Sequence, residues 1–168
     1  LEAVNIRQPA SALGVSPMTP YRYFRDKDEI IDAVRTSAYN RFADALEAAF
    51  EAVADPTDRS IAVGEAYLDF ALNESRAYAL MFDLKDMGSQ PSEGLLAAGR
   101  RAQACQVRHV QGLIEAGLIS GSADDFGNIF WATVYGFAGL MLLGQVSPEE
   151  GRRLHRMTCL RLIASAAP

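Results

Sequence analysis

The stretch NIRQPASALGVSPMTPYRYFRDK, residues 5–27, decides the fold expected at the start of this 168-residue chain. Asn5 is a good N-cap, and its helix is expected to end at Gly14, because helices often stop at a left-handed glycine. Ser16 is a second N-cap, and Pro17 occupies the favoured first helical position. Two short helices joined by a tight turn that contains a glycine are typical of a helix-turn-helix.

The second short helix is expected to have distinct inward and outward faces. Pro20 and Phe24 share the inward face, whereas Met18, Thr19, Arg22 and Tyr23 point elsewhere. This outward mixture of thioether, hydroxyl, guanidinium and phenol suits base edges and thymine methyl groups. The helix N-terminus at Ser16 and the charge of Lys27 suit phosphates. The alternative is a solvated helical hairpin whose polar residues contact no nucleic acid.

The rest of the chain also has helical periodicity and no strand-like alternation, so the expected fold class is all-α. Apolar residues recur every four positions from Ile30 through Val34 to Phe50, which predicts a long amphipathic helix capped by Asp26. Asp124–Gln145 is apolar nearly all round, as expected of a helix buried on several sides. Further helices are expected around Tyr67–Leu72, Tyr78–Leu84 and Leu95–Ala116, and from Pro148, capped by Ser147, to about Ala164.

Charge is unevenly distributed along the chain. The whole sequence has a net charge of −5, which argues against a general polyanion binder. Residues 5–27 hold four basic residues and one acidic residue, a net charge of +3 that leaves −8 for the rest. A basic head on an acidic body would confine nucleic-acid contact to the head, although chance clustering explains these charges equally well. We expect a helix-turn-helix head over residues 1–40 and a body over residues 41–168.

Nothing in the sequence predicts an enzyme, a metal site or a cofactor. Cys105 and Cys159 lack metal-ligand spacing and a disulfide framework, so they are expected to be reduced thiols in the cytoplasm. His109 and His155 lie in charged helical stretches, are expected to be solvated, and lack the Glu-x-x-His spacing of di-iron bundles. No phosphate-binding glycine loop or Gly-x-Ser-x-Gly motif is present. The mostly apolar segment Ile129–Gly144 is shorter than the ~20 residues of a membrane-spanning helix.

Two segments of the head, Ala10–Ser16 and Tyr21–Ile30, together with Thr19, resemble the DNA-binding head of the TetR family of repressors. The resemblance implies that Tyr21 and Lys27 hold phosphates and that Phe24 closes the core of the head. It also implies that Thr19, Arg22 and Met18 approach bases. The sequence departs from the family where Pro20 replaces the usual leucine and where Leu1–Val4 stand in for the first helix, which is largely absent. The predicted DNA-binding residues are Arg7, Ser16, Pro17, Met18, Thr19, Tyr21, Arg22, Tyr23 and Lys27.

The segments Tyr67–Ala71, Tyr78–Phe82 and Trp131–Gly136 resemble the ligand-binding half of a TetR subgroup that has a Trp…His-Gly signature. Tyr135 stands at the usual histidine. The resemblance implies a pocket for a small apolar effector, with tyrosine hydroxyls and Asn128 as polar anchors. The alternative is that these aromatic residues simply fill the core. The predicted ligand-binding residues are Tyr67, Phe70, Tyr78, Met81, Phe82, Trp131 and Tyr135.

The last two predicted helices carry more apolar surface than the core of one small domain can cover. Gly136 and Gly139 would allow close helix approach, and the resemblance implies that these helices pair with their twofold mates in a homodimer. Two heads about one DNA turn apart, ~34–36 Å, would then fit a near-palindromic operator in double-stranded DNA. The other residues assigned to this surface are Leu140, Leu143, Leu154, Met157 and Ile163.

Two functions are consistent with these patterns. The first is a cytoplasmic transcriptional repressor that a small apolar effector releases from its operator. The second is a helical protein that binds a ligand or a partner and whose head has lost DNA binding.

Overall fold

The computed structural model describes residues 18, 22–82 and 90–167, and within these ranges it contains helices and connecting turns but no strand. The all-α fold class predicted from the sequence is therefore confirmed. The predicted helix-turn-helix over residues 5–24 lies almost entirely outside the described residues. In chain order the described helices are α2 (Lys27–Ala52), α3 (Pro56–Asn73), α4 (Ser75–Met81), α5 (Glu93–Glu115), α6 (Ala123–Leu142) and α7 (Pro148–Ser165).

Side-chain caps explain where the helices begin. The Asp26 carboxylate accepts a hydrogen bond of 2.9 Å from the backbone N–H of Glu29 and starts α2, as the sequence predicted. Ser147 caps α7 and Pro148 follows it in the first turn, again as predicted. α5 begins two residues earlier than expected, because the Ser92 hydroxyl caps its first turn.

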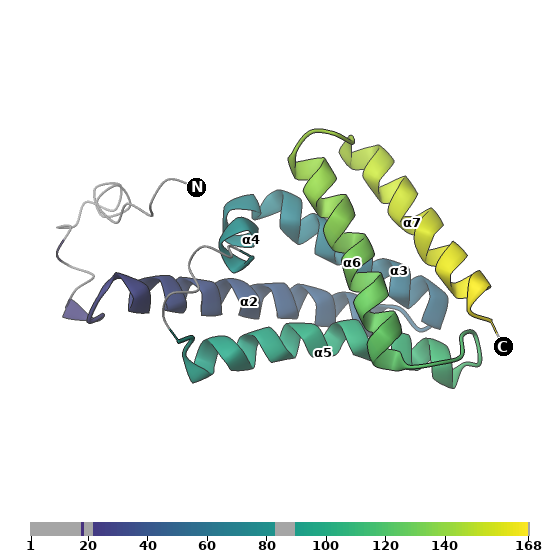
Figure 1. The fold of residues 1–168 in the computed structure, drawn as a ribbon, viewed down its shortest axis with the longest axis horizontal. Coiled ribbons are helices and arrows are strands. Elements are labelled where there is room, and N and C mark those ends of the chain that lie inside the picture. The colour runs from purple at the N-terminus through teal and green to yellow at the C-terminus, as the bar shows by residue number, and fades with distance from the viewer. Residues whose placement is uncertain (1–17, 19–21, 83–89, 168) are drawn as a thin grey trace.

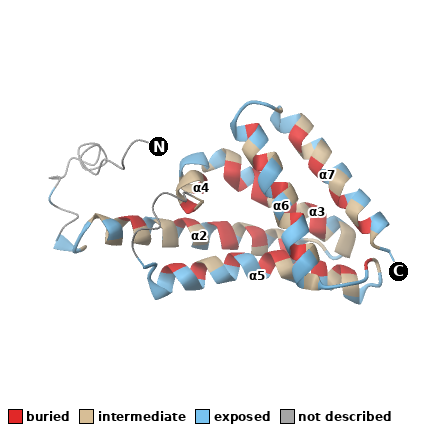
Figure 2. Cartoon of the chain, in the orientation of Figure 1, coloured by how far each residue is buried: buried red, intermediate tan, exposed pale blue. Residues whose placement is uncertain are grey.

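Figure 1 shows α2 and α5 side by side along the longest axis of the molecule, with α6 crossing over them and α7 running beside α6. The residues coloured as buried in Figure 2 lie where these helices face one another. They form a larger apolar cluster with members on α2, α3, α4, α5 and α6, and a smaller one with members on α3, α5, α6 and α7. α2 passes without a break through the domain boundary predicted at residues 40 and 41. Its first half therefore belongs to the body as much as to a head.

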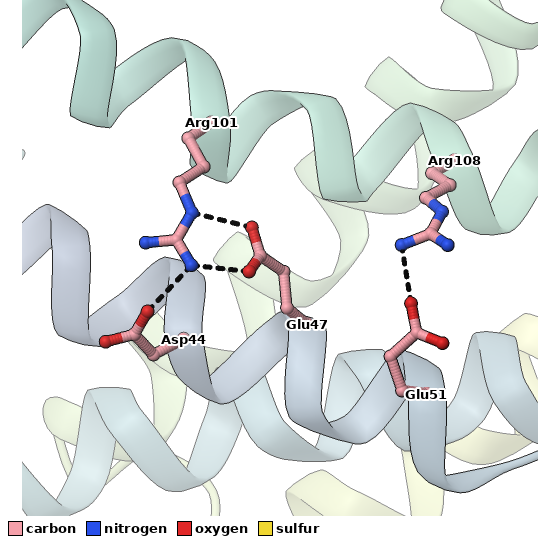
Figure 3. Close-up of polar contacts among 5 residues, drawn as sticks. All are labelled: Asp44, Glu47, Glu51, Arg101 and Arg108. Atoms are coloured by element: carbon pink, nitrogen blue, oxygen red, sulfur yellow. Dashed lines mark hydrogen bonds and ion pairs between the residues drawn. The ribbon is translucent and has the colours of Figure 1, made fainter.

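Ion pairs fasten the C-terminal half of α2 to α5, and we call this group the α2–α5 ladder (Figure 3). The Arg101 guanidinium donates at 2.7 Å to Asp44 and also binds both carboxylate oxygens of Glu47. Further along α5, Arg108 pairs with Glu51 at 2.8 Å. These side chains are exposed, so each pair contributes little to the stability of the fold. Their geometric effect is to hold the two helices in register.

The prediction that the histidines are solvated is wrong. His109 and His155 are each only 2% exposed. The Ser60 hydroxyl lies 3.0 Å from Nδ1 of His109, and the Cys159 sulfur lies 3.3 Å from Nε2 of His155. Charged neighbours suggested exposure, but helical spacing places His109 four residues before the buried Leu113 and thus on the core side of α5. Burial lowers the pKa of both imidazoles to about 4.

The prediction that α6 is buried on several sides is also wrong for the single chain. Ile129, Tyr135, Leu140 and Leu143 are all exposed along or just beyond α6. One face of this apolar helix is therefore uncovered within a single subunit. Within the described ranges, no helix combines the length and apolar character that a membrane crossing requires.

Candidate functional site

A cavity of about 620 Å³ lies between α2, α5 and α6, with the end of α4 as a further wall. This volume is within the range of ~300–1,000 Å³ that is common for small-molecule pockets. Its walls are mainly apolar and aromatic, with amide side chains and one guanidinium among them. The lining residues are Arg35, Tyr39, Phe42, Met81, Phe82, Gly99, Ala102, Gln103, Gln106, Asn128, Trp131, Ala132 and Tyr135.

The structure brings four of the predicted ligand-binding residues together at this cavity. Met81 and Phe82 come from the end of α4, and Trp131 and Tyr135 come from α6. Asn128, expected to be a polar anchor, also lines the cavity. These residues are up to 54 positions apart in the sequence, between Met81 and Tyr135, so the resemblance grouped them correctly in space.

The three remaining predicted residues lie behind the cavity wall. Tyr67 and Phe70 belong to the larger apolar cluster on α3, and neither lines the cavity. Tyr78 is 5% exposed, and its ring packs against Phe82, with the centroids 4.8 Å apart. The hydroxyls of Tyr67 and Tyr78 are 3.0 Å apart, and burial raises the pKa of Tyr67 to about 12 and that of Tyr78 further. This hydrogen-bonded pair supports the wall from inside the core.

Sequence reasoning missed the contribution of α2 and α5 to the cavity. Arg35, Tyr39 and Phe42 on α2 and Gln106 on α5 all line it. The apolar repeat placed Val34 on the inner stripe of α2, but Val34 is 48% exposed. A polar residue at position 35 was available as a signal, because it lies four residues before Tyr39 and seven before Phe42 on one helical face.

Two of the missed residues hold the end of α4. The backbone carbonyl of Met81 accepts hydrogen bonds from the Tyr39 hydroxyl at 3.1 Å and from the Arg35 guanidinium at 3.4 Å. Burial raises the pKa of Tyr39, so the phenol remains a neutral donor. The last carbonyls of a helix have no partner within the helix, and these two side chains supply one.

Two polar atoms at the cavity have no hydrogen-bond partner. Nε of Arg35 and Nε2 of Gln106 are both buried, and neither finds an acceptor among the described residues. An unsatisfied buried donor costs about 1–3 kcal/mol, and a bound molecule that supplies an acceptor would remove this cost. Among the described residues, no aspartate or glutamate lines the cavity.

A second cavity, of about 370 Å³, adjoins the first toward the start of α2. Arg35, Tyr39, Gly99 and Gln103 line both, so these residues form the wall between the two spaces. The smaller cavity differs in that Asp28, Asp32 and Arg100 make its lining strongly charged.

The exposed sides of α6 and α7 form a second candidate surface. Gly136 and Gly139 on α6 are open, because a Cβ added at either position would meet no atom within 4 Å. On α7, Met157 and Leu160 are 45% and 44% exposed. Ile163, which the sequence assigned to this surface, is instead buried in the smaller apolar cluster. We call the exposed apolar residues Ile129, Leu140, Leu143, Met157 and Leu160, with the two open glycines, the α6–α7 face.

The C-terminal domain of tetracyclin repressor-like proteins, as a family model, matches residues 60–160 of the sequence. This chain belongs to the TetR family. Members of this family are transcriptional regulators and not enzymes. The matched residues include most of α3 and of α7 and all of α4, α5 and α6, that is, much of the cavity and of the α6–α7 face.

Solved structures share the TetR fold over nearly the whole chain. A protein of unknown function from Rhodococcus sp. RHA1 is similar with a TM-score of 0.85 and 28% identity, over 98% of this chain and 86% of the other. The TetR-family transcriptional regulator PfmR from Thermus thermophilus is similar with a TM-score of 0.75 and 22% identity, over 99% of this chain and 91% of the other. No curated protein matches the sequence significantly.

The residues predicted to bind DNA in this TetR-family chain lie mostly outside the described ranges. Of those within them, Met18, Arg22 and Tyr23 are exposed, and Lys27 is the first residue of α2. These four side chains are therefore placed at the N-terminal end of the long helix that reaches the cavity. The predicted residues outside the described ranges are Arg7, Ser16, Pro17, Thr19 and Tyr21.

Proposed function

We propose that this protein is a DNA-binding transcriptional repressor that leaves its operator when a small, largely apolar effector occupies the 620 Å³ cavity. Such a regulator works in the cytoplasm, where the operator is. The observation that carries the proposal is the continuity of α2, which starts at Lys27 and supplies Arg35, Tyr39 and Phe42 to the cavity. The same helix thus starts at the end of the chain predicted to contact DNA and supplies side chains to the proposed effector site.

The distances suit a direct mechanical coupling. Lys27 and Tyr39 are twelve residues apart on α2, which corresponds to about 18 Å along the helix axis. An effector regulates DNA binding only if it binds more tightly to one of two arrangements of the heads. A ligand that touches α2 directly has contacts that change whenever α2 tilts, so it meets this requirement.

The α6–α7 face is proposed to join two subunits. Its residues recur along α6 and just beyond it at positions 129, 136, 140 and 143, a helical spacing that makes one continuous stripe. The open glycines would let a second helix approach closely, as an isologous interface with the same stripe on a partner subunit requires. Sedimentation should then give a dimer at micromolar concentration, and a monomer would contradict the interface.

DNA binding by the full-length gene product tests the proposed function. Fluorescence anisotropy with DNA from upstream of its own gene should reveal a specific complex. Arg22→Ala is expected to cost about 1–3 kcal/mol at particular bases, whereas Lys27→Ala should weaken all sequences alike and lower the salt slope by about one. Arg76→Ala is the matched control, because Arg76 is exposed on α4 and is not among the predicted DNA-binding residues.

Absence of a specific complex under any salt condition would refute the regulator function. Tight binding of a small molecule by the same sample would then favour the second hypothesis, a ligand-binding protein with a degenerate head.

A further inference from the structure

We infer that the effector is a monocarboxylic acid with a bulky apolar body, and that Arg35 binds its carboxylate. This inference depends on the proposed function, because it assigns a ligand class to the same cavity. It goes further in that the aromatic walls alone would predict a neutral apolar compound.

The first argument is the unpaired charge of Arg35. Among the described residues no carboxylate lies within 4.0 Å of its guanidinium, whereas most other arginines of α5 and α7 that face α2 or α3 are paired. Its one hydrogen bond is a long one, 3.4 Å, to the carbonyl of Met81, and its Nε is buried without an acceptor. Arg35 is half-buried, and a charge partly removed from water is normally paired, because desolvation without a partner is costly. A ligand anion would supply that partner.

The second argument is the hydrogen-bonding character of the other polar groups. Gln106 is only 6% exposed, lines the cavity, and has no acceptor for its amide Nε2. The Tyr39 hydroxyl at the same wall already donates to the carbonyl of Met81, so the donors without an acceptor are Nε of Arg35 and Nε2 of Gln106. These donors call for acceptor oxygens, and a carboxylate offers two oxygens without a donor of its own.

The third argument concerns how much charge the ligand carries. Among the described residues, Arg35 is the only cationic side chain in the cavity lining, so this lining balances a single negative charge. The planar fork of a guanidinium matches a carboxylate with two parallel hydrogen bonds. A phosphorylated ligand would bring about two charges and would leave one without a partner.

The rest of the lining accommodates an apolar body. Phe42, Met81, Phe82 and Trp131 present aromatic rings and a thioether to the cavity. Each buried CH₂ group contributes about 0.8 kcal/mol, so an extended hydrocarbon would provide most of the affinity and the carboxylate most of the selectivity.

Binding of matched probes tests this inference on the full chain. Trp131 is the single tryptophan of the sequence and lines the cavity, so its fluorescence reports occupancy. Decanoate and decanol differ only at the head group. We expect decanoate to bind with a Kd about tenfold lower than that of decanol, since a charged hydrogen-bond pair contributes about that much.

Two variants test which side chains make the cavity prefer decanoate to decanol. Arg35→Met should remove the preference for decanoate, so that the Kd values of the two probes become equal, whereas the control Arg76→Met should keep the preference. Gln106→Leu, which changes no charge, should weaken decanoate several-fold and decanol little. Circular dichroism of each variant verifies the fold, and the Gln106 variant still tests the inference if Arg35→Met does not fold.

The outcomes separate this inference from the proposed function. Equal binding of decanol and decanoate, or an unchanged preference in Arg35→Met, would overturn the carboxylate assignment and leave an apolar effector site standing. Failure of both probes to bind would refute the cavity as an effector site for apolar ligands. Binding of decanoate without any effect on the DNA complex would support the assignment and count against effector-controlled release.

Discussion

The body of the protein has two ends that use buried polar groups in opposite ways. In what we call the cavity end, around Arg35 and Gln106, buried donors face an open space and lack acceptors. In the closed end, around Ser60, His109 and Leu113, Ser60 and His109 pair with each other and the apolar residues pack together, although Nδ1 of the nearby His155 is also buried without a partner among the described residues. Both ends draw on α5, so a single helix carries an unsatisfied glutamine and, one turn later, a satisfied histidine. The role of a buried polar group thus depends on whether a hydrogen-bond partner lies beside it in the core.

Truncation of core side chains should show the largest difference between the two ends. Leu113 is fully buried in the closed end, so Leu113→Ala should lower the free energy of unfolding by about 3 kcal/mol. Phe82 borders open space at the cavity end, so Phe82→Ala should cost about 1 kcal/mol, because less packing is lost there. Urea unfolding of the two variants measures both, and equal losses would show that the cavity is closed in solution.

Acid should weaken the closed end through its histidines. Burial lowers the pKa of His109 and His155 to about 4, whereas the unfolded rings bind protons near pH 6.5. Between these values the unfolded state binds more protons, so the free energy of unfolding falls as the pH drops. From pH 7 to pH 5 we expect a loss of about 2 kcal/mol per histidine.

Single replacements attribute this pH dependence to the rings. His109→Gln and His155→Gln should each remove about half of the difference between unfolding at pH 7 and at pH 5. If both variants retain the full dependence, the two imidazoles are not responsible for it.

Two glycines give the most direct contrast, because their replacements are expected to change stability in opposite directions. In the closed end, a Cβ on Gly64 would overlap the ring atoms Cε1 and Nε2 of His155, so Gly64→Ala should destabilise the fold by about 1–3 kcal/mol. At the cavity end, Gly99 lies inside α5 and a Cβ there would meet nothing within 4 Å. Gly99→Ala should therefore stabilise the fold by about 0.5–1 kcal/mol. Thermal unfolding shifts of the same sign would contradict the contrast.

Local signals predicted the helices well because caps and periodicity act within a few residues of the chain. Asp26, Ser147 and Pro148 mark helix starts in the structure as they did in the sequence. His109 and His155 were misjudged, since the charges beside them in the sequence lie on a different side of the helix.

The sequence predicted only about half of the candidate site. An aromatic pattern shows which face of a helix points inward, but it does not show whether that face meets a cavity or other side chains. Trp131 and Tyr135 meet a gap, whereas Tyr67 and Phe70, which look equivalent in the sequence, meet other side chains. Arg35 was overlooked, since a charged residue on an amphipathic helix is ordinarily solvated. Only the three-dimensional arrangement shows that it reaches into the body.

In the proposed mechanism, the α2–α5 ladder is the fulcrum about which α2 tilts. Asp44 and Glu47 join the C-terminal half of α2 to α5, while its N-terminal half, where Asp32 accepts a hydrogen bond from the backbone N–H of Ser92, extends past the cavity to Lys27. From Asp44 to Lys27 the arm is seventeen residues, or about 26 Å, so a tilt of about 5° at the fulcrum moves its tip by about 2 Å. A small displacement of α2 at the cavity would thus become a larger displacement of Lys27, at the end of the chain predicted to contact DNA.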